Sequence, residues 1–251
     1  MSSSILQARQ LVVVRDGRRT IDALDLCVPA GTVYALLGGN GAGKTTTLNA
    51  FLGFVKPASG EVTVDGTVVQ EDAQAARDKL AYLPENVALY PYLSSIENLQ
   101  YFCTLAGIRI DASEAGELLS QAGLQASAHG VRASSYSKGM RQKVGLAIAY
   151  AKHAKAMLLD EPTSGLDPSA ANDFAARVRA ARDRGMAVLM ATHDLFNAKQ
   201  VADRIGILRE GRLVEEFAAH GVGHDELERI YLAHALGVTD DHFTDVSEPS
   251  A

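Results

Sequence analysis

The sequence predicts an α/β fold in which a core with a parallel sheet carries an antiparallel β subdomain and a helical subdomain, all within a single domain. Unbroken apolar runs, typical of strands buried on both faces, occur at residues 33–37, 156–159 and 187–191. Apolar stretches around Asp-Gly turn signals predict hairpins in the first 70 residues, and helical periodicity dominates residues 94–155.

The composition is that of an ordinary packed protein with an excess of acids. The 251 residues are 47% hydrophobic and 22% charged, with a net charge of −6. This balance excludes a largely disordered chain and a general basic nucleic-acid binder, so we expect no nucleic-acid partner. Cys27 and Cys103 form no CxxC pair, and no apolar run has the roughly 18 residues of a membrane span. We therefore expect a protein of the cytoplasm, which meets a membrane only through another chain.

Residues 1–85 are expected to hold the β subdomain and the first strand of the core. Two hairpins are predicted because Asp16-Gly17 and Asp65-Gly66 each lie between apolar segments. The short run 33–37 lies between these hairpins and predicts a strand of the parallel sheet.

Residues 86–155 are expected to form the helical subdomain. Ser94 and Asp111 are each followed three residues later by Glu, in the manner of a capping box that opens a helix. The next two apolar runs flank an amphipathic helix pattern at 170–184, which predicts a strand–helix–strand unit of a parallel sheet.

The chain is expected to end on a strand pair, a helix and a tail. The strand pair turns at Glu210-Gly211 and completes the second part of the core, residues 156–220. The remaining residues, 221–251, form a C-terminal extension. An amphipathic pattern at 225–236 predicts its short helix, and the acidic, small-residue segment 239–251 predicts a loose tail.

A phosphate-binding loop follows the first core strand. Its pattern is G-x-x-x-x-G-K-[ST], and a helix pattern follows it at 45–52, as this motif requires. Backbone N–H groups, a helix N-terminus and the Lys44 ammonium would attract phosphate, and the Thr45 hydroxyl would bind Mg²⁺. A plain glycine-rich turn is the alternative; the dinucleotide spacing G-x-G-x-x-G is absent. The residues expected to contact the nucleotide are Gly38, Gly39, Asn40, Gly41, Ala42, Gly43, Lys44, Thr45 and Thr46. The sequence thus predicts the core of a phosphate-loop (P-loop) nucleoside triphosphatase.

Asp160 and Glu161 end the apolar run at 156–159. Two adjacent carboxylates at a buried strand end are costly unless a cation faces them, and Mg²⁺ beside the phosphate loop would be that cation. Asp160 would hold the metal, while Glu161 would take a proton from the attacking water. An acidic strand end without chemistry is the alternative.

With these motifs in this order, residues 5–220 resemble the ATPase subunits of ATP-binding cassette (ABC) transporters. Segment 136–142, Y-S-K-G-M-R-Q, resembles the family signature, which is usually L-S-G-G-Q. Ser137 would cap a helix there and, with the Gly139 amide, form a second anion site. The resemblance implies that two ATPases, identical or different, pair head to tail, so that each ATP lies between one phosphate loop and the other signature. It also implies that His193 contacts the γ-phosphate and the attacking water.

Two positions depart from the family pattern. Glu85, at the end of Y-L-P-E, stands where the family usually has a Gln that reaches Mg²⁺. A carboxylate can bind the metal but adds repulsion toward the γ-phosphate. Near Asp16-Gly17 no Tyr or Phe stands where the family usually stacks an aromatic ring on adenine, so the contact to the base is not identified. Y-S-K-G-M and L-P-E are similar to the ABC-2 exporter branch, and residues 82–99 are also similar to ATPases that serve maturation of the copper enzyme nitrous oxide reductase.

The resemblance implies a dimeric Mg-ATPase that binds at the inner face of the cell membrane and powers a membrane-spanning subunit on a separate chain, in export. The aromatic-rich segment 86–102 would receive a helix of that subunit. Two alternatives keep the same motifs: a soluble ABC ATPase without transport, and a nucleotide-gated clamp with little turnover. A P-loop kinase or GTPase has no use for the signature, and the N-K-x-D guanine motif is absent.

Overall fold

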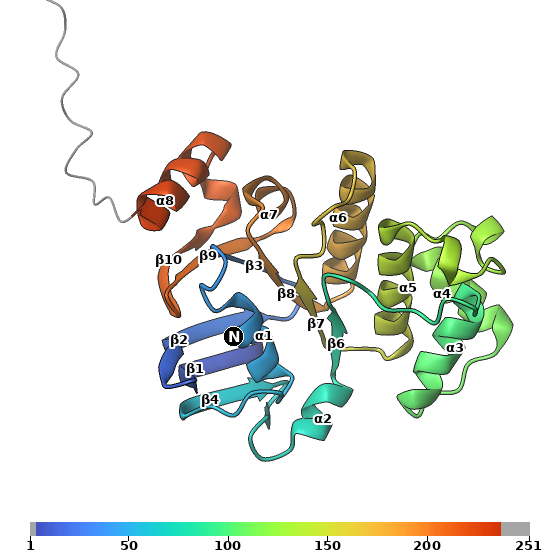
Figure 1. Ribbon diagram of the computed structural model, residues 1–251, viewed down its shortest axis with the longest axis horizontal. Coiled ribbons are helices and arrows are strands. Elements are labelled where there is room, and N and C mark those ends of the chain that lie inside the picture. The colour runs from blue at the N-terminus through green and yellow to red at the C-terminus, as the bar shows by residue number, and fades with distance from the viewer. Residues whose placement is uncertain (1–3, 237–251) are drawn as a thin grey trace, which may run out of the picture.

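The computed structural model describes residues 4–236, which form two sheets and the helices around them (Figure 1). The smaller sheet is antiparallel with strand order β2-β1-β4-β5. Its strands are β1 (Ser4–Arg15), β2 (Arg18–Pro29), β4 (Ser59–Val64) and β5 (Thr67–Val68). The two predicted hairpins are confirmed, because β1 pairs with β2 and β4 pairs with β5 across their Asp-Gly turns.

The larger sheet has strand order β10-β9-β3-β8-β7-β6. Its strands are β3 (Val33–Leu37), β6 (Leu80–Leu83), β7 (Ala156–Asp160), β8 (Ala187–Thr192), β9 (Arg204–Arg209) and β10 (Arg212–Ala218). All neighbouring pairs are parallel except β10, which runs antiparallel to β9. Because β3, β7 and β8 run side by side in the same direction, their carboxyl ends meet at one edge, where ligands bind in open α/β sheets.

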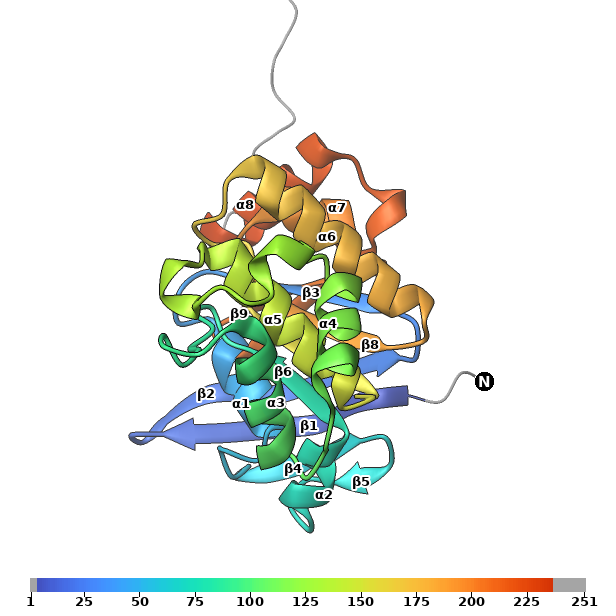
Figure 2. The same cartoon turned by 90° about the vertical axis from the view of Figure 1, so that its right-hand side faces the viewer.

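The helices divide into those that cover the sheets and those that form a separate group. They are α1 (Lys44–Phe51), α2 (Ala73–Asp78), α3 (Ser95–Leu105), α4 (Ala112–Gln121), α5 (Lys138–Ala151), α6 (Pro168–Asp183), α7 (Leu195–Val201) and α8 (His224–Leu236). Helices α3, α4 and α5 gather at the right-hand end of Figure 1 as the helical subdomain. Figure 2 looks onto that end, with the antiparallel sheet below and α6 above. Within residues 4–236, no helix is both long enough and apolar enough to cross a bilayer.

Strand β3 shows why its sequence is an unbroken apolar run. Val33, Ala35 and Leu37 belong to the core cluster that includes Val144 of α5 and Val178 of α6. The alternate residues, Tyr34 and Leu36, belong to the cluster that includes α1 and the antiparallel sheet. All five β3 residues are fully buried, so the strand must be apolar on both faces.

Three elements were not predicted, namely α2, β6 and α7. All are short, at four to seven residues, so they carry too few turns or alternations for a periodic signal. The two helix starts predicted in the helical subdomain differ in detail. Ser94 makes a full capping box with Glu97, whereas Asp111 accepts only from the Glu114 N–H within the described residues. The predicted tail, 239–251, lies outside the described residues.

Candidate functional site

The phosphate loop connects the carboxyl end of β3 to the first turn of α1. Glycine is required at two of its positions by close approach: a Cβ on Gly38 would lie 2.5 Å from the Leu208 carbonyl oxygen, and one on Gly43 would lie 2.7 Å from the Thr20 carbonyl oxygen. Gly43 also has φ of +110°, a backbone angle that residues with a side chain rarely adopt. The loop is therefore packed against its neighbours, and the free N–H groups of the α1 N-terminus lie next to it.

Lys44 bends back over this loop. Its ammonium donates to the carbonyl oxygens of Gly38, at 2.7 Å, and Gly39, at 3.2 Å, and lies 3.4 Å from Oε1 of Glu161. Lys44 is 7% exposed, so its charge acts in a largely water-excluded place, where electrostatic attraction is strong. Thr46, the last residue predicted to contact the nucleotide, is also buried, in the first turn of α1.

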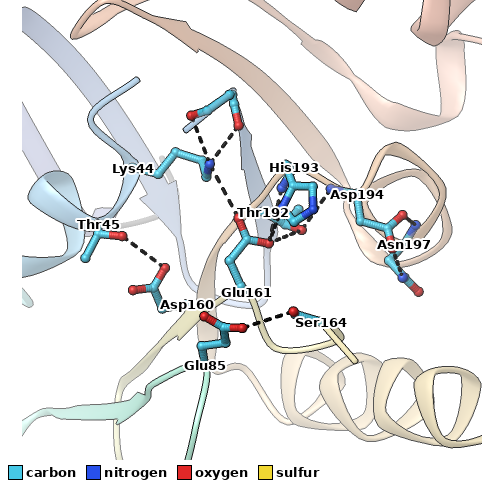
Figure 3. A network of polar contacts seen from close by, with 12 residues as sticks. Lys44, Thr45, Glu85, Asp160, Glu161, Ser164, Thr192, His193, Asp194 and Asn197 are labelled. Atoms are coloured by element: carbon cyan, nitrogen blue, oxygen red, sulfur yellow. Dashed lines mark hydrogen bonds and ion pairs between the residues drawn. The ribbon is translucent and has the colours of Figure 1, made fainter. Parts of the chain in front are cut away.

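Thr45 and Asp160 face each other beside the loop, with the Thr45 hydroxyl 3.3 Å from Oδ1 of Asp160 (Figure 3). Burial raises the pKa of Asp160. The hydrogen bond from the Thr45 hydroxyl lowers this pKa in part, and the neighbouring charge of Glu161 raises it further. The Thr45 hydroxyl and the charge of Lys44 offset only part of the cost of burying the Asp160 carboxylate. The two hard oxygen ligands therefore fit Mg²⁺, with Thr45 and Asp160 as the residues that would hold it.

Glu161 is the most connected side chain of the site. Its Oε2 lies 2.9 Å from Nδ1 of His193 and accepts from the Thr192 hydroxyl at 3.0 Å, while its Oε1 faces Lys44 (Figure 3). The backbone N–H of His193 also points at Oε2, at 3.3 Å. Burial acts to raise the pKa of Glu161, but the His193 hydrogen bond and the Lys44 charge outweigh it and hold the pKa below its ordinary value. Glu161 is thus a fixed, ionised carboxylate.

The backbone explains how Glu161 reaches this place. It follows β7 with φ of +44°, a strained conformation for a residue with a side chain, and its N–H donates to Ala191 of the adjacent strand β8 at 2.9 Å. Thr192 and His193 follow Ala191 directly, so the parallel pairing of β7 with β8 places their donors around the carboxylate.

A cavity of about 590 Å³ opens beside Glu161. Its wall includes His193 from the β8–α7 connection, Phe196 from the first turn of α7, and Ser164 and Gly165 from the loop after β7. Phe196 and His193 are well exposed, with 58% of the His193 side chain accessible. The site is therefore open on the side of His193, whereas the Lys44 side chain is buried.

Glu85 lies in the loop after β6, at the same edge of the sheet. Its Oε1 accepts from the Ser164 hydroxyl at 3.0 Å and lies 3.8 Å from the Lys138 ammonium. Within residues 4–236, no hydrogen bond joins it to Thr45 or Asp160. The binding of a metal by Glu85 remains a prediction, whereas the structure shows its contacts with the loop after β7 and with the first turn of α5.

Ser137 caps α5 through a hydrogen bond from the Met140 N–H, at 3.3 Å, as the sequence predicts. Neither Ser137 nor Gly139 is joined to the phosphate loop by a hydrogen bond or ion pair in the part of the chain that the structure describes. One copy of the chain therefore brings Lys44, Thr45, Asp160, Glu161 and His193 together and leaves the signature segment outside that group.

Sequence reasoning missed Thr192 and Ser164. Thr192 looks like one more residue of a strand, and only the register of β7 with β8 reveals that its hydroxyl points at Glu161. Ser164 looks like a loop serine, and its contact with Glu85 joins positions 79 residues apart. No local sequence pattern marks either residue, because both contacts depend on the order in which the strands pair.

Comparison with known proteins agrees with this geometry. The sequence model of the family described as "ABC transporter" matches residues 21–164, more than half of the chain. YhcH of Bacillus subtilis, an uncharacterized ABC transporter ATP-binding protein, is 34% identical over 213 residues, covering 84% of this chain and 69% of that protein. The daunorubicin/doxorubicin resistance ATP-binding protein DrrA of Streptomyces peucetius is 36% identical over 213 residues, covering 84% of this chain and 64% of that protein.

Solved structures show the same fold. An ATP-binding subunit of an ABC transporter superposes with a TM-score of 0.78 at 27% identity, over 91% of this chain and 99% of that chain. A dimeric ATP-binding cassette with bound ADP and Pi superposes with a TM-score of 0.75 at 24% identity, over 85% of this chain and 98% of that chain. The fold, the phosphate loop and these relatives agree, and the chain belongs to the ABC transporter family as one of its ATP-binding, ATP-hydrolysing subunits.

Proposed function

We propose that this subunit hydrolyses ATP with Glu161 as the general base. The closure of two ATPases on ATP and their reopening on hydrolysis would drive an exporter whose membrane-spanning part is a separate chain. The observation that carries the proposal is the fixed Glu161 carboxylate, held by Thr192 and His193 beside Lys44. Its lowered pKa keeps it ionised near neutral pH, so it can accept a proton. A low pKa also makes a weaker base, so the orientation of the attacking water matters more than base strength.

The triphosphate would lie on the loop from Gly38 to Gly43, with Lys44 and the α1 N-terminus facing its charge. Mg²⁺ held at Thr45 and Asp160 would supply charge neutralisation for the phosphoryl group in transfer. His193 would contact the γ-phosphate side of the nucleotide; in support, it is 58% exposed and lies next to Glu161. Its Nδ1 contact with Glu161 orients both side chains.

The second anion site, at Ser137 and Gly139, would act on a nucleotide bound to another ATPase. The support is that one chain leaves this helix N-terminus outside the Lys44 group, while a helix N-terminus favours phosphate. A second copy of this chain, or a different ATPase of the same family, would complete each site. The cavity beside His193 opens on the side where such a partner would bind.

The membrane subunit would bind an aromatic cluster on the helical subdomain. Tyr90 and Tyr101 pack edge to face with ring centroids 4.6 Å apart, and Phe102 packs edge to face on Tyr101 at 5.5 Å. Tyr92, beside them in sequence, is 79% exposed. Clustered, exposed aromatic side chains are typical of anchoring surfaces, and a partner there would hold the ATPase at the cytoplasmic face of a membrane. Similarity to ATP-binding proteins of drug resistance and of bacitracin transport supports export.

The chemical part is tested with Glu161→Gln, which keeps the shape and removes the base. We expect ATP hydrolysis to fall by about two to four orders of magnitude, with nucleotide binding retained. Light scattering should show this variant as a dimer with MgATP and as a monomer without it. A Gln variant with the parental rate of phosphate release contradicts the assignment of the base. A parent protein that binds ATP with almost no release would support the clamp alternative.

The docking part is tested by co-purification with the membrane subunit. Tyr92→Ala should weaken retention, because Tyr92 has the most exposed aromatic side chain of segment 86–102. Phe54→Ala is the matched control, since Phe54 is also an exposed aromatic residue, at 65%, but lies after α1, away from the helical subdomain. Equal retention of the two variants contradicts this docking surface. A parent that hydrolyses ATP and retains no membrane protein would indicate the soluble alternative.

A further inference from the structure

Two loops and the first turn of α5, all distant in sequence, meet at the carboxylate of Glu85. Ser164, in the loop after β7, donates to Oε1 at 3.0 Å, and the ammonium of Lys138, the first residue of α5, lies 3.8 Å from the same oxygen. That ammonium also lies 3.9 Å from the point where a side chain on Gly165 would begin. The Lys138 charge is therefore held over both the Glu85 side chain and the 164–165 loop.

The position of Lys138 is unfavourable on local grounds. It occupies the first turn of α5, where the helix macrodipole favours an anion and disfavours a cation. An acidic partner within reach offsets that disadvantage, and Glu85 is the ion-pair partner that the structure gives it. The pairing thus accounts for a lysine at a helix start.

The position of Glu85 is unfavourable in the same way. Asp160 and Glu161 already place two carboxylates at this sheet edge, and Glu85 adds a third. A third carboxylate repels both of them and any polyanion bound to the phosphate loop. An ammonium close to Glu85 reduces this repulsion without removing the carboxylate.

We propose that Lys138 is a positioning residue of the nucleotide site that acts through Glu85: the ion pair offsets the Glu85 charge and holds that side chain against Ser164. The two departures from the family pattern, at Glu85 and at Lys138, then compensate each other within one chain. This inference rests on the proposed function, because it assumes that Glu85 faces a bound triphosphate.

The size of the effect follows from the exposure of the pair. The Lys138 and Glu85 side chains are 25% and 49% exposed, so water and salt screen their attraction, and such pairs change an equilibrium by about 1.5- to 5-fold. Lys138→Gln should therefore raise the KM for ATP by about two- to fivefold, because an uncompensated carboxylate repels the nucleotide. The kcat should change less than about twofold, and Lys138→Arg, which keeps the charge, should retain the parental KM.

The decisive measurement is the same substitution in a second background. In the Glu85→Gln protein there is no charge for Lys138 to offset, so Lys138→Gln should leave the KM unchanged. The matched control is the ion pair of Lys143, also on α5, with Asp173 at 2.6 Å. The equivalent cycle with Lys143→Gln and Asp173→Asn should show no coupling in KM, although it can show coupling in unfolding.

One result overturns the inference: the same rise in KM from Lys138→Gln in both backgrounds. That outcome would mean that Lys138 acts on the nucleotide directly, or on the helix, without Glu85. Failure of the proposed function is distinct, because it shows as a Glu161→Gln protein that hydrolyses ATP at the parental rate. If the enzyme does depend on Glu161 but the effects of Lys138→Gln and Glu85→Gln on KM are additive, only the role of the ion pair is refuted, and the proposed function stands.

Discussion

Replacement of Thr192 by Val isolates the hydroxyl that orients Glu161. Thr192 is 1% exposed at the end of β8, and its hydroxyl donates to Oε2 of Glu161 at 3.0 Å. Val has nearly the same shape, so the substitution removes the donor without opening a cavity. A hydrogen bond to a charged group contributes about 1.5–3 kcal/mol, which corresponds to about 10- to 160-fold if the whole loss falls on kcat. His193 remains as a donor, so we expect the lower end, about tenfold.

The assay is steady-state phosphate release with Thr192→Ser as the control. Ser keeps the hydroxyl and should retain most of the parental kcat, and the KM for ATP should be similar in all three proteins. Thr192 also accepts from the Asp194 N–H at 3.1 Å, so Val should lower the unfolding free energy by about 1–3 kcal/mol and Ser by less. Rates are therefore compared well below the melting temperatures. A Val protein with the parental kcat, or a Ser protein as slow as Val, refutes the orienting role.

Two further substitutions test the charge and the backbone of the structure. Asp160→Asn should lower magnesium-dependent ATP hydrolysis by at least about 100-fold yet raise the melting temperature of the nucleotide-free protein. The pKa of Asp160 is raised by burial, so its charge costs stability above that pKa, and the stability gain of Asn should shrink as the pH is lowered. A parental melting temperature at neutral pH contradicts this. Gly60→Ala should lower the unfolding free energy in urea by about 2–4 kcal/mol, because its Cβ would lie 2.3 Å from the Gln10 carbonyl oxygen at φ of +83°. Gly66→Ala, at φ of +76° with no atom within 4 Å of its Cβ, is the control and should lose only about 1 kcal/mol; equal losses refute the clash.

The sequence predicts the elements of this fold better than their arrangement. Strand β3 was predictable because burial on both faces requires an apolar residue at every position. Strand β6 was missed although its four residues are all apolar, because a run that short does not by itself distinguish a strand from other buried segments; β6 pairs with β7 and leads into Glu85. The start of β1 was missed as well, since Gln10, at φ of +46°, interrupts the alternation of that strand. Irregular and short strands depend on their partners, which a local pattern cannot show.

The same division holds for the site. Lys44, Asp160 and Glu161 were predictable because each belongs to a contiguous motif with a clear chemical reason. The contacts among Glu85, Lys138 and Ser164 were not, because they join two loops and the first turn of α5 through tertiary packing. The sequence shows that Glu85 and Lys138 are both unusual, but only the structure shows that they lie together.

Asp160 and Glu161 are adjacent in sequence, yet the fold gives them opposite electrostatic environments. Asp160 has one hydroxyl donor and burial, so its pKa rises, whereas Glu161 turns the other way at φ of +44° toward His193 and Lys44, so its pKa falls. Groups whose pKa values are pushed apart in this way are suited to different tasks. A carboxylate whose charge is only partly offset is suited to hold a cation, and one that is already fixed by donors is suited to orient a water molecule. The change of backbone direction between two residues is what allows one strand end to supply both.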